Sequence, residues 1–500
     1  MTQLNNLSEF LIFRNKQDNR IDIAFYKGYF NEIKVQVSEE VSALIGYKYS
    51  NGDLDDGEYV SIHIDGNVIT INNDYYASIP VYIYEDTAHI VLSSSIYLIN
   101  QILPHNINLN SNWLYTYFAF GYLPATTKTI YKNITTMEPN SELVLNEKIK
   151  QNIGTKILRE IDTATSIQQL INNFNNSVKM KSNLNQKGEN SFCLSSGFDS
   201  LLGALSLKSQ GATVSTSTWG AKDSDDILAA RARCLALDLT EKHFELIING
   251  LNIGYDDYCR FSNITGGISP TSSIYLMPFT EFMVKHGKFS HLYCDFLEIT
   301  RRHYKTLDEL KSKYITPKNV SAEYFIDKEL YNIDINEAFD NISRKYDNYM
   351  QMYLLDRCVK GAFYKNAVIR TFGSIKSTFS LDAIFLQTNY SYVMSNGYSY
   401  NALVREYSKS TELKIDLSDQ KINKPNEHFS FSALDLISKN NQLFNDIINE
   451  NSAIDFSQFF DLDKIKVSLY ENQYIEKSEW FFHRLFNLLI FKKENSIGIS

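Results

Sequence analysis

The stretch that decides the fold reads Ser191-Phe192-Cys193-Leu194-Ser195-Ser196-Gly197-Phe198-Asp199-Ser200. Its first four residues predict a short buried strand, residues 201–210 have helical character, and residues 213–219 predict a second strand. Strand, small-residue turn, helix and strand together form one βαβ unit. Because parallel strands need a sheet that is covered on its faces, this stretch predicts an α/β domain.

The turn between this strand and helix has the residue types that a phosphate site needs. First-turn amides of a helix have no partner within the helix, and the helix dipole is positive there. Gly197 and the hydroxyls of Ser195 and Ser196 let an anion approach the backbone, and Ser200 can donate to the same oxygens. Asp199 can ligate an accompanying Mg²⁺. The alternative is a polar turn with an N-capping residue. A nucleophile elbow needs G-x-S-x-G, and neither serine lies in that frame.

Ligands of open α/β sheets bind outside the carboxyl ends of the strands. We therefore expect a phosphate-bearing ligand to be bound by the loop and by the end of the second strand. The expected residues are Ser195, Ser196, Gly197, Phe198, Asp199, Ser200, Thr218 and Trp219.

The rest of the chain divides into a β-rich part and a mainly helical part. Strands are predicted at 60–64, 68–71, 80–84 and 89–92, with turn signals at Asn51-Gly52 and Asp65-Gly66. Helices are predicted at 112–120, 167–181, 347–371, 432–449 and 474–491. We expect an antiparallel β-rich domain at 1–150 and an ATP-binding domain with a helical C-terminal part at 151–500.

Composition excludes several classes of protein. The 500 residues are 44% hydrophobic and 21% charged, which is typical of compact globular proteins, and two domains are the natural expectation for this length. A net charge of -9 disfavours nucleic acid and anionic membranes as partners. The five cysteines are scattered, without metal-ligand spacing, and no stretch predicts a membrane span. We expect a cytoplasmic protein.

The loop resembles the S-G-G-x-D-S signature of the PP-loop ATP pyrophosphatases, with Ser196 in place of one glycine. Asp225-Asp226, followed by alanines at 229, 230, 232 and 236, resembles the helix after strand two in the asparagine synthetase family. Residues 243–246 resemble its third strand. The two aspartates are also explained as helix-start charges that complement the helix dipole.

The N-terminal half resembles the same family. Residues 73–74, 79–82 and 91–95 resemble its glutamine amidotransferase-like domain, and residues 121–124, 129–131, 134 and 137–139 resemble the segment that joins its two domains. A glutaminase of this family uses an N-terminal cysteine, whereas this chain begins Met1-Thr2-Gln3 and its first cysteine is Cys193. The chain is therefore most similar to members without glutaminase activity, such as β-lactam synthetases and lasso peptide cyclases.

Other positions depart from the family pattern. Residues 291–302 stand where the family has a loop reading roughly G-x-G-x-D-E, and the resemblance implies Asp295 or Glu298 as Mg²⁺ ligands. Arg301 and Arg302 either contact phosphate or are solvated. Residues 379–382 resemble a family turn, but the Glu and Arg expected upstream are replaced at 374–377, so no general base is identified. The implied catalytic lysine has two candidates, Lys421 and Lys424, which are equally explained as surface residues.

The resemblance implies an ATP-dependent, AMP-forming carbon–nitrogen ligase, in which Mg²⁺ assists and Asp199, Glu298 and Lys421 or Lys424 are catalytic. A substrate carboxylate is adenylated, pyrophosphate leaves, and an amine attacks. A lasso-peptide-type macrolactam cyclase is favoured, with a peptide or small-molecule carboxylate as substrate and a leader-peptide-binding protein and a protease as partners. The alternatives are a non-catalytic scaffold subunit, an ammonia-dependent amidotransferase acting on a small molecule, and a base- or tRNA-modifying enzyme.

Overall fold

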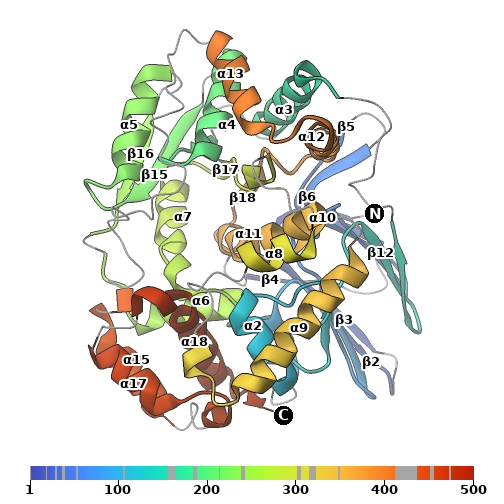
Figure 1. Ribbon diagram of the computed structural model, residues 1–500. Helices are drawn as coiled ribbons and strands as arrows, with labels where there is room; N and C mark the ends of the chain where they lie inside the picture. The colour runs from blue at the N-terminus through green and yellow to red at the C-terminus, as the bar shows by residue number, and fades with distance from the viewer. Residues whose placement is uncertain are drawn as a thin grey trace.

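The structure is a computed structural model that describes residues 2–499 except 19, 29–30, 36–39, 52–53, 105–106, 155–164, 184–188, 213, 238–241, 250, 301–305, 315–321, 347–348, 411–435, 438, 451–454 and 472–474. Two sheets from the N-terminal third lie beside a parallel sheet covered by helices, with a further group of helices near the C-terminus (Figure 1). This arrangement confirms the predicted fold class.

The N-terminal part is a sandwich of two six-stranded sheets. The first has the order β1 (Thr2–Leu7), β5 (Val41–Asn51), β6 (Leu54–Asp65), β7 (Val68–Asn73), β12 (Ser141–Leu145), β13 (Ile149–Ile153). The second has the order β11 (Ile134–Thr136), β8 (Tyr82–Glu85), β9 (His89–Ser93), β2 (Glu9–Asn15), β3 (Ile21–Lys27), β4 (Asn31–Val35). Every pair is antiparallel except β1 with β5.

Alternating side chains explain how these sheets pack. In β7, Val68 is exposed whereas Ile69 and Ile71 are fully buried, as the period of two in a strand requires. These isoleucines share a core with side chains of the second sheet such as Phe10. The predicted turn after Asp65 is confirmed as a two-residue connection between β6 and β7, and its glycine has the positive φ that such a turn favours.

The predicted βαβ unit is confirmed within a five-stranded sheet. Its order is β16 (His243–Ile247), β15 (Ser215–Gly220), β14 (Asn190–Cys193), β17 (Ser290–Tyr293), β18 (Ile375–Thr378), and all neighbours are parallel. Helix α4 (Phe198–Ser209) begins three residues earlier than predicted, because the chain is still extended at Gly197 and turns helical directly after it. Half of the expected loop is therefore the first turn of the helix.

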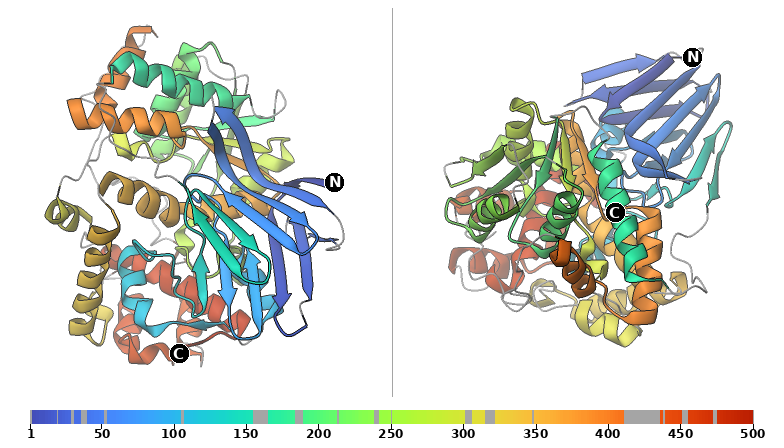
Figure 2. Two further views of the ribbon diagram at one scale, coloured as in Figure 1. Left: turned by 90° about the vertical axis from the view of Figure 1, so that its right-hand side faces the viewer. Right: turned by 90° about the horizontal axis from the view of Figure 1, so that it is seen from above.

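Helices cover this sheet in two groups (Figure 2). One contains α3 (Ile167–Ser182), α4, α5 (Asp225–Leu237), α12 (Ala383–Asn396) and α13 (Tyr400–Ser410), and the other contains α6 (Tyr255–Thr265), α7 (Leu276–Lys285) and α11 (Phe363–Thr371). Gly203 lets α4 approach the sheet, since a Cβ there would lie 2.9 Å from the ring of Phe192 and 3.0 Å from Sγ of Cys294. The loop before α4 is thereby fixed to the strand ends.

The predicted helix at 112–120 is confirmed as a short 3₁₀ turn followed by α2 (Leu114–Phe120). The helix predicted at 347–371 is present as a π-helix (Tyr353–Val359) before α11, and the one predicted at 474–491 is α18 (Ile475–Asn495). Of the helix predicted at 432–449, the described part includes α15 (Asn441–Asn449), whereas residues 432–435 lie outside the described residues. Helices α9 (Lys328–Lys345) and α17 (Leu462–Glu471) were not predicted. Helix α18 packs on α2 and α6, and β19 (Gly498–Ile499) pairs with β10 (Asn108–Leu109).

Polar contacts join the β-rich part to the helix-covered sheet. Arg370 of α11 lies 3.1 Å from Glu9, and both side chains are buried. The hydroxyl of Tyr49 donates to Asp382 at 2.9 Å. The proposed division after residue 150 stays a prediction, and β13 extends to Ile153. Among the described residues, no helix combines the length and apolar character that crossing a bilayer requires.

Candidate nucleotide site at the carboxyl edge of the parallel sheet

The loop at residues 195–200 lies at the point where the strand order reverses. From β14 the chain moves to β15 and then β16 on one side, and it later returns to β17 and β18 on the other (Figure 1). The carboxyl edge between β14 and β17 is therefore the position where open α/β sheets bind ligands. Two segments meet at this edge: the loop after β14, and residues 294–300 after β17, which we call the second loop.

Hydrogen bonds within the first loop hold its backbone. The amide of Ser195 donates to Oγ of Ser200 at 3.2 Å, and the amide of Gly197 donates to Oγ of Ser195 at 3.2 Å. Oγ of Ser200 also donates to the carbonyl of Gly197 at 2.9 Å. The serines thus shape the loop, and these two amides are bonded inside it.

A carboxylate from the neighbouring helix α5 accepts a hydrogen bond from the amide of Ser196, which lies between Ser195 and Gly197. Oδ1 of Asp226, in the first turn of α5, accepts from the amide of Ser196 at 2.8 Å and from its hydroxyl at 2.6 Å. The sequence left two interpretations of Asp226 open, a helix-start charge and a catalytic residue at the start of the resembled family helix. In the structure it also binds the loop, at an amide that we expected to face a phosphate.

Arg233 holds the opposite side of the loop. Its guanidinium donates to the carbonyl of Ser195, to that of Ser196 at 2.9 Å, and to that of Gly197 at 2.9 Å. Burial lowers its pKa, while nearby Tyr400 and Asp226 act in the opposite direction. Sequence reasoning missed this residue. Its signal was the spacing of seven from Asp226, which places both side chains on one face of α5.

The remaining residues expected at the nucleotide site have mixed settings. Thr218 is buried near the end of β15, and Trp219 beside it stacks on Tyr275 with ring centroids 6.5 Å apart. The ring of Phe198 packs edge-on against Tyr400 at 5.7 Å. Asp199 lies in the first turn of α4, where a negative charge is favourable to the helix dipole. The residues expected at the nucleotide site therefore lie in the first loop, in the first turn of α4 and near the end of β15.

The second loop contains a carboxylate paired with two lysines. Asp295 lies 2.9 Å from Nζ of Lys365 on α11 and 3.9 Å from Nζ of Lys376 on β18. Burial acts to raise the pKa of Asp295, but the lysines outweigh it, so the pKa is lowered. Phe296 follows with φ of 70°, a backbone conformation typical of glycine. The glycines that the resemblance implied for this loop are absent, and Phe296 itself adopts the left-handed backbone conformation.

Lys376 also links the second loop to the N-terminal sandwich. Its Nζ lies 3.6 Å from Oε2 of Glu58 on β6, and both side chains are buried. Glu58 accepts from the backbone amide of Thr378 at 2.6 Å and from the hydroxyl of Tyr47 at 2.8 Å. Sequence reasoning looked for a general base at 374–377. The structure places a buried, ion-paired lysine there.

A buried acidic group lies close to this network. Asp56 of β6 accepts from the backbone amide of Ala383 at 2.7 Å, next to Asp382. Burial and repulsion from Asp382 raise the pKa of Asp56 to about 7, although Lys181 acts against them. This side of the edge therefore contains a buried carboxyl whose pKa is raised.

Several predicted residues lie outside the described part of the chain. These are Lys421, Lys424, Arg301, Arg302 and the side chain of Glu298. Within the described residues, no three His, Cys, Asp or Glu side chains are grouped so that they could hold a metal ion. Asp295 as a Mg²⁺ ligand would first have to separate from its two lysines. The predicted roles of all these residues remain predictions.

Comparisons with known proteins give little similarity. No protein-family model matches the chain, and no curated protein does. A solved allosteric regulatory enzyme of purine biosynthesis is 9% identical with a TM-score of 0.18, covering 48% of this chain and 74% of its own. The glutamine phosphoribosylpyrophosphate amidotransferase of B. subtilis, complexed with ADP and GMP, is 11% identical with a TM-score of 0.15, covering 59% and 61%. Scores this low carry no argument, so the family resemblance rests on the residues quoted above.

Proposed function

We propose that this chain is an ATP-dependent synthetase that adenylates a substrate carboxylate and lets an amine attack the product to form an amide. The observation that carries the proposal is the strand-to-helix loop at residues 195–200, located where the strand order of a parallel sheet reverses. Such loops bind phosphates through amides and the helix dipole. The guanidinium of Arg233 holds the loop by donating hydrogen bonds to the backbone carbonyls of Ser196 and Gly197.

The proposal assigns each side of the edge a task. Ser195, Ser200 and the first turn of α4 would hold the phosphates of ATP, after Asp226 releases the amide of Ser196. Lys365 would place positive charge at the same edge. A bound Mg²⁺ would withdraw charge from the phosphates and the leaving pyrophosphate, and Asp199, in the first turn of α4, is proposed to hold it.

The amine is proposed to belong to the substrate itself, as in the amide-forming synthetases without glutaminase activity that the sequence resembles. The finer proposal is a lasso-type macrolactam cyclase that joins a peptide's N-terminal amine to an acidic side chain. A leader-peptide-binding protein and a protease would then act beside it. Co-expression with a short precursor peptide should give a product lighter by one water, and a purely linear product would contradict cyclisation.

Release of pyrophosphate tests the general proposal. The protein with ATP, Mg²⁺ and a carboxylate substrate should release pyrophosphate, and Asp199→Ala should abolish the release. Asp223→Ala is the matched control, because Asp223 is an exposed acidic residue just before α5. Equal activity in the wild type and Asp199→Ala would refute the assignment.

A second candidate is a nucleotide-binding or scaffold subunit without catalysis. It is favoured by the ion pairs of Asp295 with Lys365 and Lys376, which occupy a carboxylate expected to bind metal. Calorimetry separates the two proposals. Binding of ATP without turnover on any tested carboxylate supports the second candidate, and pyrophosphate release excludes it.

A further inference from the structure

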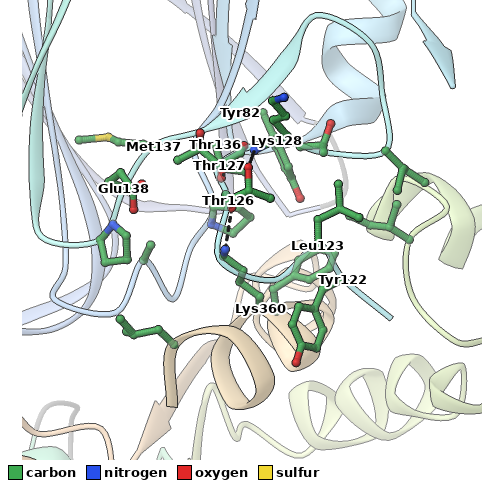
Figure 3. Close-up of a pocket in the computed structure, with 18 of the residues that line it drawn as sticks. Tyr82, Tyr122, Leu123, Thr126, Thr127, Lys128, Thr136, Met137, Glu138 and Lys360 are labelled. Atoms are coloured by element: carbon green, nitrogen blue, oxygen red, sulfur yellow. Dashed lines mark hydrogen bonds between the residues drawn. The ribbon is translucent and has the colours of Figure 1, made fainter. Parts of the chain in front are cut away.

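A cavity of about 100 Å³ lies between the N-terminal sandwich and the helical part, away from the loop at residues 195–200. Strand β8, the segment that follows α2, the π-helix and the start of α11 contribute its walls (Figure 3). Most of the lining is apolar or aromatic, including Pro80, Leu123, Ile130, Met137, Leu355 and Phe363. None of the proposed nucleotide-binding residues lines it.

The hydroxyl of Tyr82 has no hydrogen-bond partner that would explain its position. The side chain is 4% exposed, and Figure 3 shows the hydroxyl directed toward Leu123 and Thr126. No hydrogen bond joins it to a described residue. A phenol in apolar surroundings is costly to leave unpaired, so this hydroxyl is a polar group available to a bound molecule.

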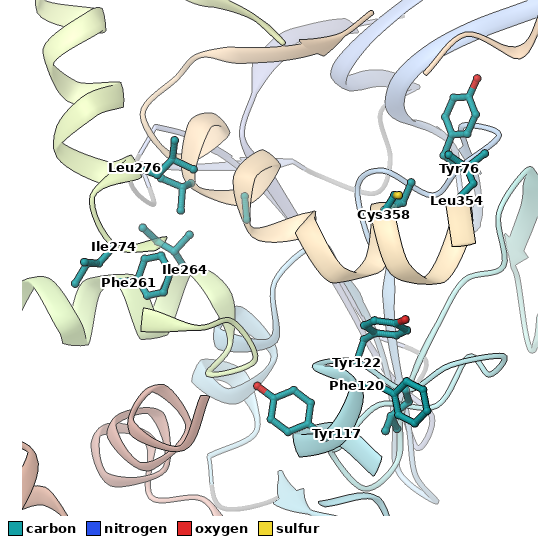
Figure 4. Close-up of a cluster of buried hydrophobic side chains, with 14 of the residues drawn as sticks. Tyr76, Tyr117, Phe120, Tyr122, Phe261, Ile264, Ile274, Leu276, Leu354 and Cys358 are labelled. Carbon is teal, nitrogen blue, oxygen red and sulfur yellow. The ribbon is translucent and has the colours of Figure 1, made fainter. Parts of the chain in front are cut away.

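Three more tyrosines of the lining repeat this feature. Tyr76, Tyr117 and Tyr122 are buried in the hydrophobic cluster of Figure 4, and their hydroxyls have no partner among the described residues. In a protein interior such groups are nearly always bonded to protein or to ordered water. Their concentration around one cavity indicates a place where a ligand or water completes the hydrogen bonding.

The backbone around the cavity is strained at two alanines. Ala77 lines the cavity with φ of 52°, and Ala125 beside it has φ of 55°. The amide of Ala125 is held at 2.7 Å by the carboxylate of Asp356, which belongs to the π-helix. Left-handed alanines and π-helices both concentrate at functional sites, where other contacts hold them in place.

Two of the three charges in the lining have oppositely charged partners. Glu138 lies 2.9 Å from Lys345, and Lys360 lies 2.8 Å from Asp356 and donates to the carbonyl of Thr126 at 2.9 Å. The third, Lys128, is exposed and lies over the ring of Trp113 at 5.1 Å. A ligand anion would lose hydration among the apolar walls and could gain only this exposed cation, and exposed ion pairs contribute little. The chemistry of the cavity favours a neutral molecule.

We propose that this cavity binds a small neutral molecule with an aromatic or branched aliphatic body and one hydrogen-bonding group that meets the hydroxyl of Tyr82. The apolar walls enclose the body, and the tyrosine hydroxyl selects the polar group. This site is separate from the proposed nucleotide site, and the inference does not depend on the proposed synthetase activity.

Phenol, toluene and benzoate distinguish the possibilities, because they share one ring and differ in polarity and charge. Titrations of the full-length protein by calorimetry and ligand-detected NMR should show saturable binding of phenol and toluene. Binding of benzoate should be at least about tenfold weaker, since its charge would lose hydration and could meet only the exposed Lys128. Absence of saturable phenol binding at millimolar concentrations, or benzoate binding as tightly as phenol, would overturn the proposal.

Variants locate the binding. Tyr82→Phe should weaken phenol by about tenfold and leave toluene unchanged, because only phenol uses the hydroxyl. Tyr84→Phe is the matched control on the same strand, where the hydroxyl donates to Asp86 instead. Thr127→Trp should block both probes, since Thr127 lines the cavity. Binding of both probes that survives Thr127→Trp would place the molecule elsewhere and overturn the proposal.

Discussion

The two loops at the carboxyl edge of the parallel sheet differ in how their charges are held. The first keeps small residues, and its backbone is held by Asp226 on the amide side and Arg233 on the carbonyl side. The second lacks the glycines that the resemblance implied, and its carboxylate is paired with Lys365 and Lys376. In the first loop, the carboxylate of Asp226 occupies the amide that a bound anion would use. In the second loop, the carboxylate of Asp295 is held in ion pairs with the two lysines.

This difference shows that backbone shape and charge pairing are set separately at the two loops. Phe296 has a positive φ without being glycine. Ser196 stands where the resembled signature has glycine, and its hydroxyl donates to Asp226. Experiments that treat the two loops alike should therefore give different results.

The largest effect is expected at the second loop. Lys376→Met would leave the buried Glu58 without its cation and Asp295 with one lysine instead of two. We expect the free energy of unfolding to fall by about 3–5 kcal/mol, as for other broken buried pairs. Lys365→Met should cost less, because Lys365 is partly exposed. Chemical denaturation of both variants measures this. Equal losses would contradict the interpretation that Lys376 forms the more deeply buried ion pairs.

Next in size is a pH dependence on the side of the second loop. The pKa of Asp56 is raised to about 7 in the folded protein, so between about pH 4 and 7 the folded state keeps a proton that the unfolded state has lost. Stability from this group is therefore present at low pH and is lost as the pH rises through this window, by a few kcal/mol. Asp56→Asn should reduce the slope of unfolding free energy against pH by about one proton. Asp55→Asn is the control, because Asp55 is exposed, and an equal change in both variants would reject the assignment.

At the first loop, Arg233→Met should lower the free energy of unfolding by about 2–3 kcal/mol, because three carbonyls lose a charged donor. Arg233→Lys should recover part of this loss, since an ammonium keeps the charge but not the planar fork. Thermal and chemical denaturation provide the comparison. A methionine variant as stable as the wild type would show that the loop keeps its conformation without the hydrogen bonds of Arg233.

Asp226→Asn should strengthen the binding of inorganic pyrophosphate by about tenfold, because it removes a negative charge from the amide of Ser196. Asp223→Asn leaves that contact in place and is the matched control. Calorimetric titration without a substrate gives both affinities. Weaker binding in Asp226→Asn would mean that the carboxylate organises the loop for the anion instead of competing with it.

The smallest effect compares glycine with alanine in both loops. At Phe296, glycine should be more stable than alanine by about 1 kcal/mol, because both lose the ring and only alanine is strained at positive φ. At Phe198, in the first turn of α4, alanine should be more stable by up to about 1 kcal/mol, because glycine is a poor helix former. Denaturation midpoints of the four variants test this, and the same order at both positions would contradict the assigned backbone conformations.

Local patterns predicted most of the fold that surrounds the site. The run from Ser191 to Ser200 predicted a strand, a loop and a helix, because hydrophobic spacing and small residues act over a few positions. The predicted start of α4 was three residues late. The extended backbone ends at Gly197, whereas the polar residues up to Ser200 indicated a longer loop. Strands β6 to β9 followed equally well from alternation and turn signals.

The partners of the site residues could not be read in the same way. Lys365 and Lys376 lie 70 and 81 positions after Asp295, and Glu58 is farther still, so no sequence spacing pairs them. The cavity at Tyr82 also depends on segments that are distant in sequence.

By itself, the sequence determined where the strand-to-helix loop at residues 195–200 occurs and which strands and helices flank it, because backbone preferences and hydrophobic periodicity are local. Only the tertiary structure decided which charges meet at the sheet edge, and hence that Asp295 is neutralised by lysines and that Asp226 lies on the loop amide. The physical reason is that an ion pair or a desolvated hydroxyl depends on distance and burial, and both are set by the packing of distant segments.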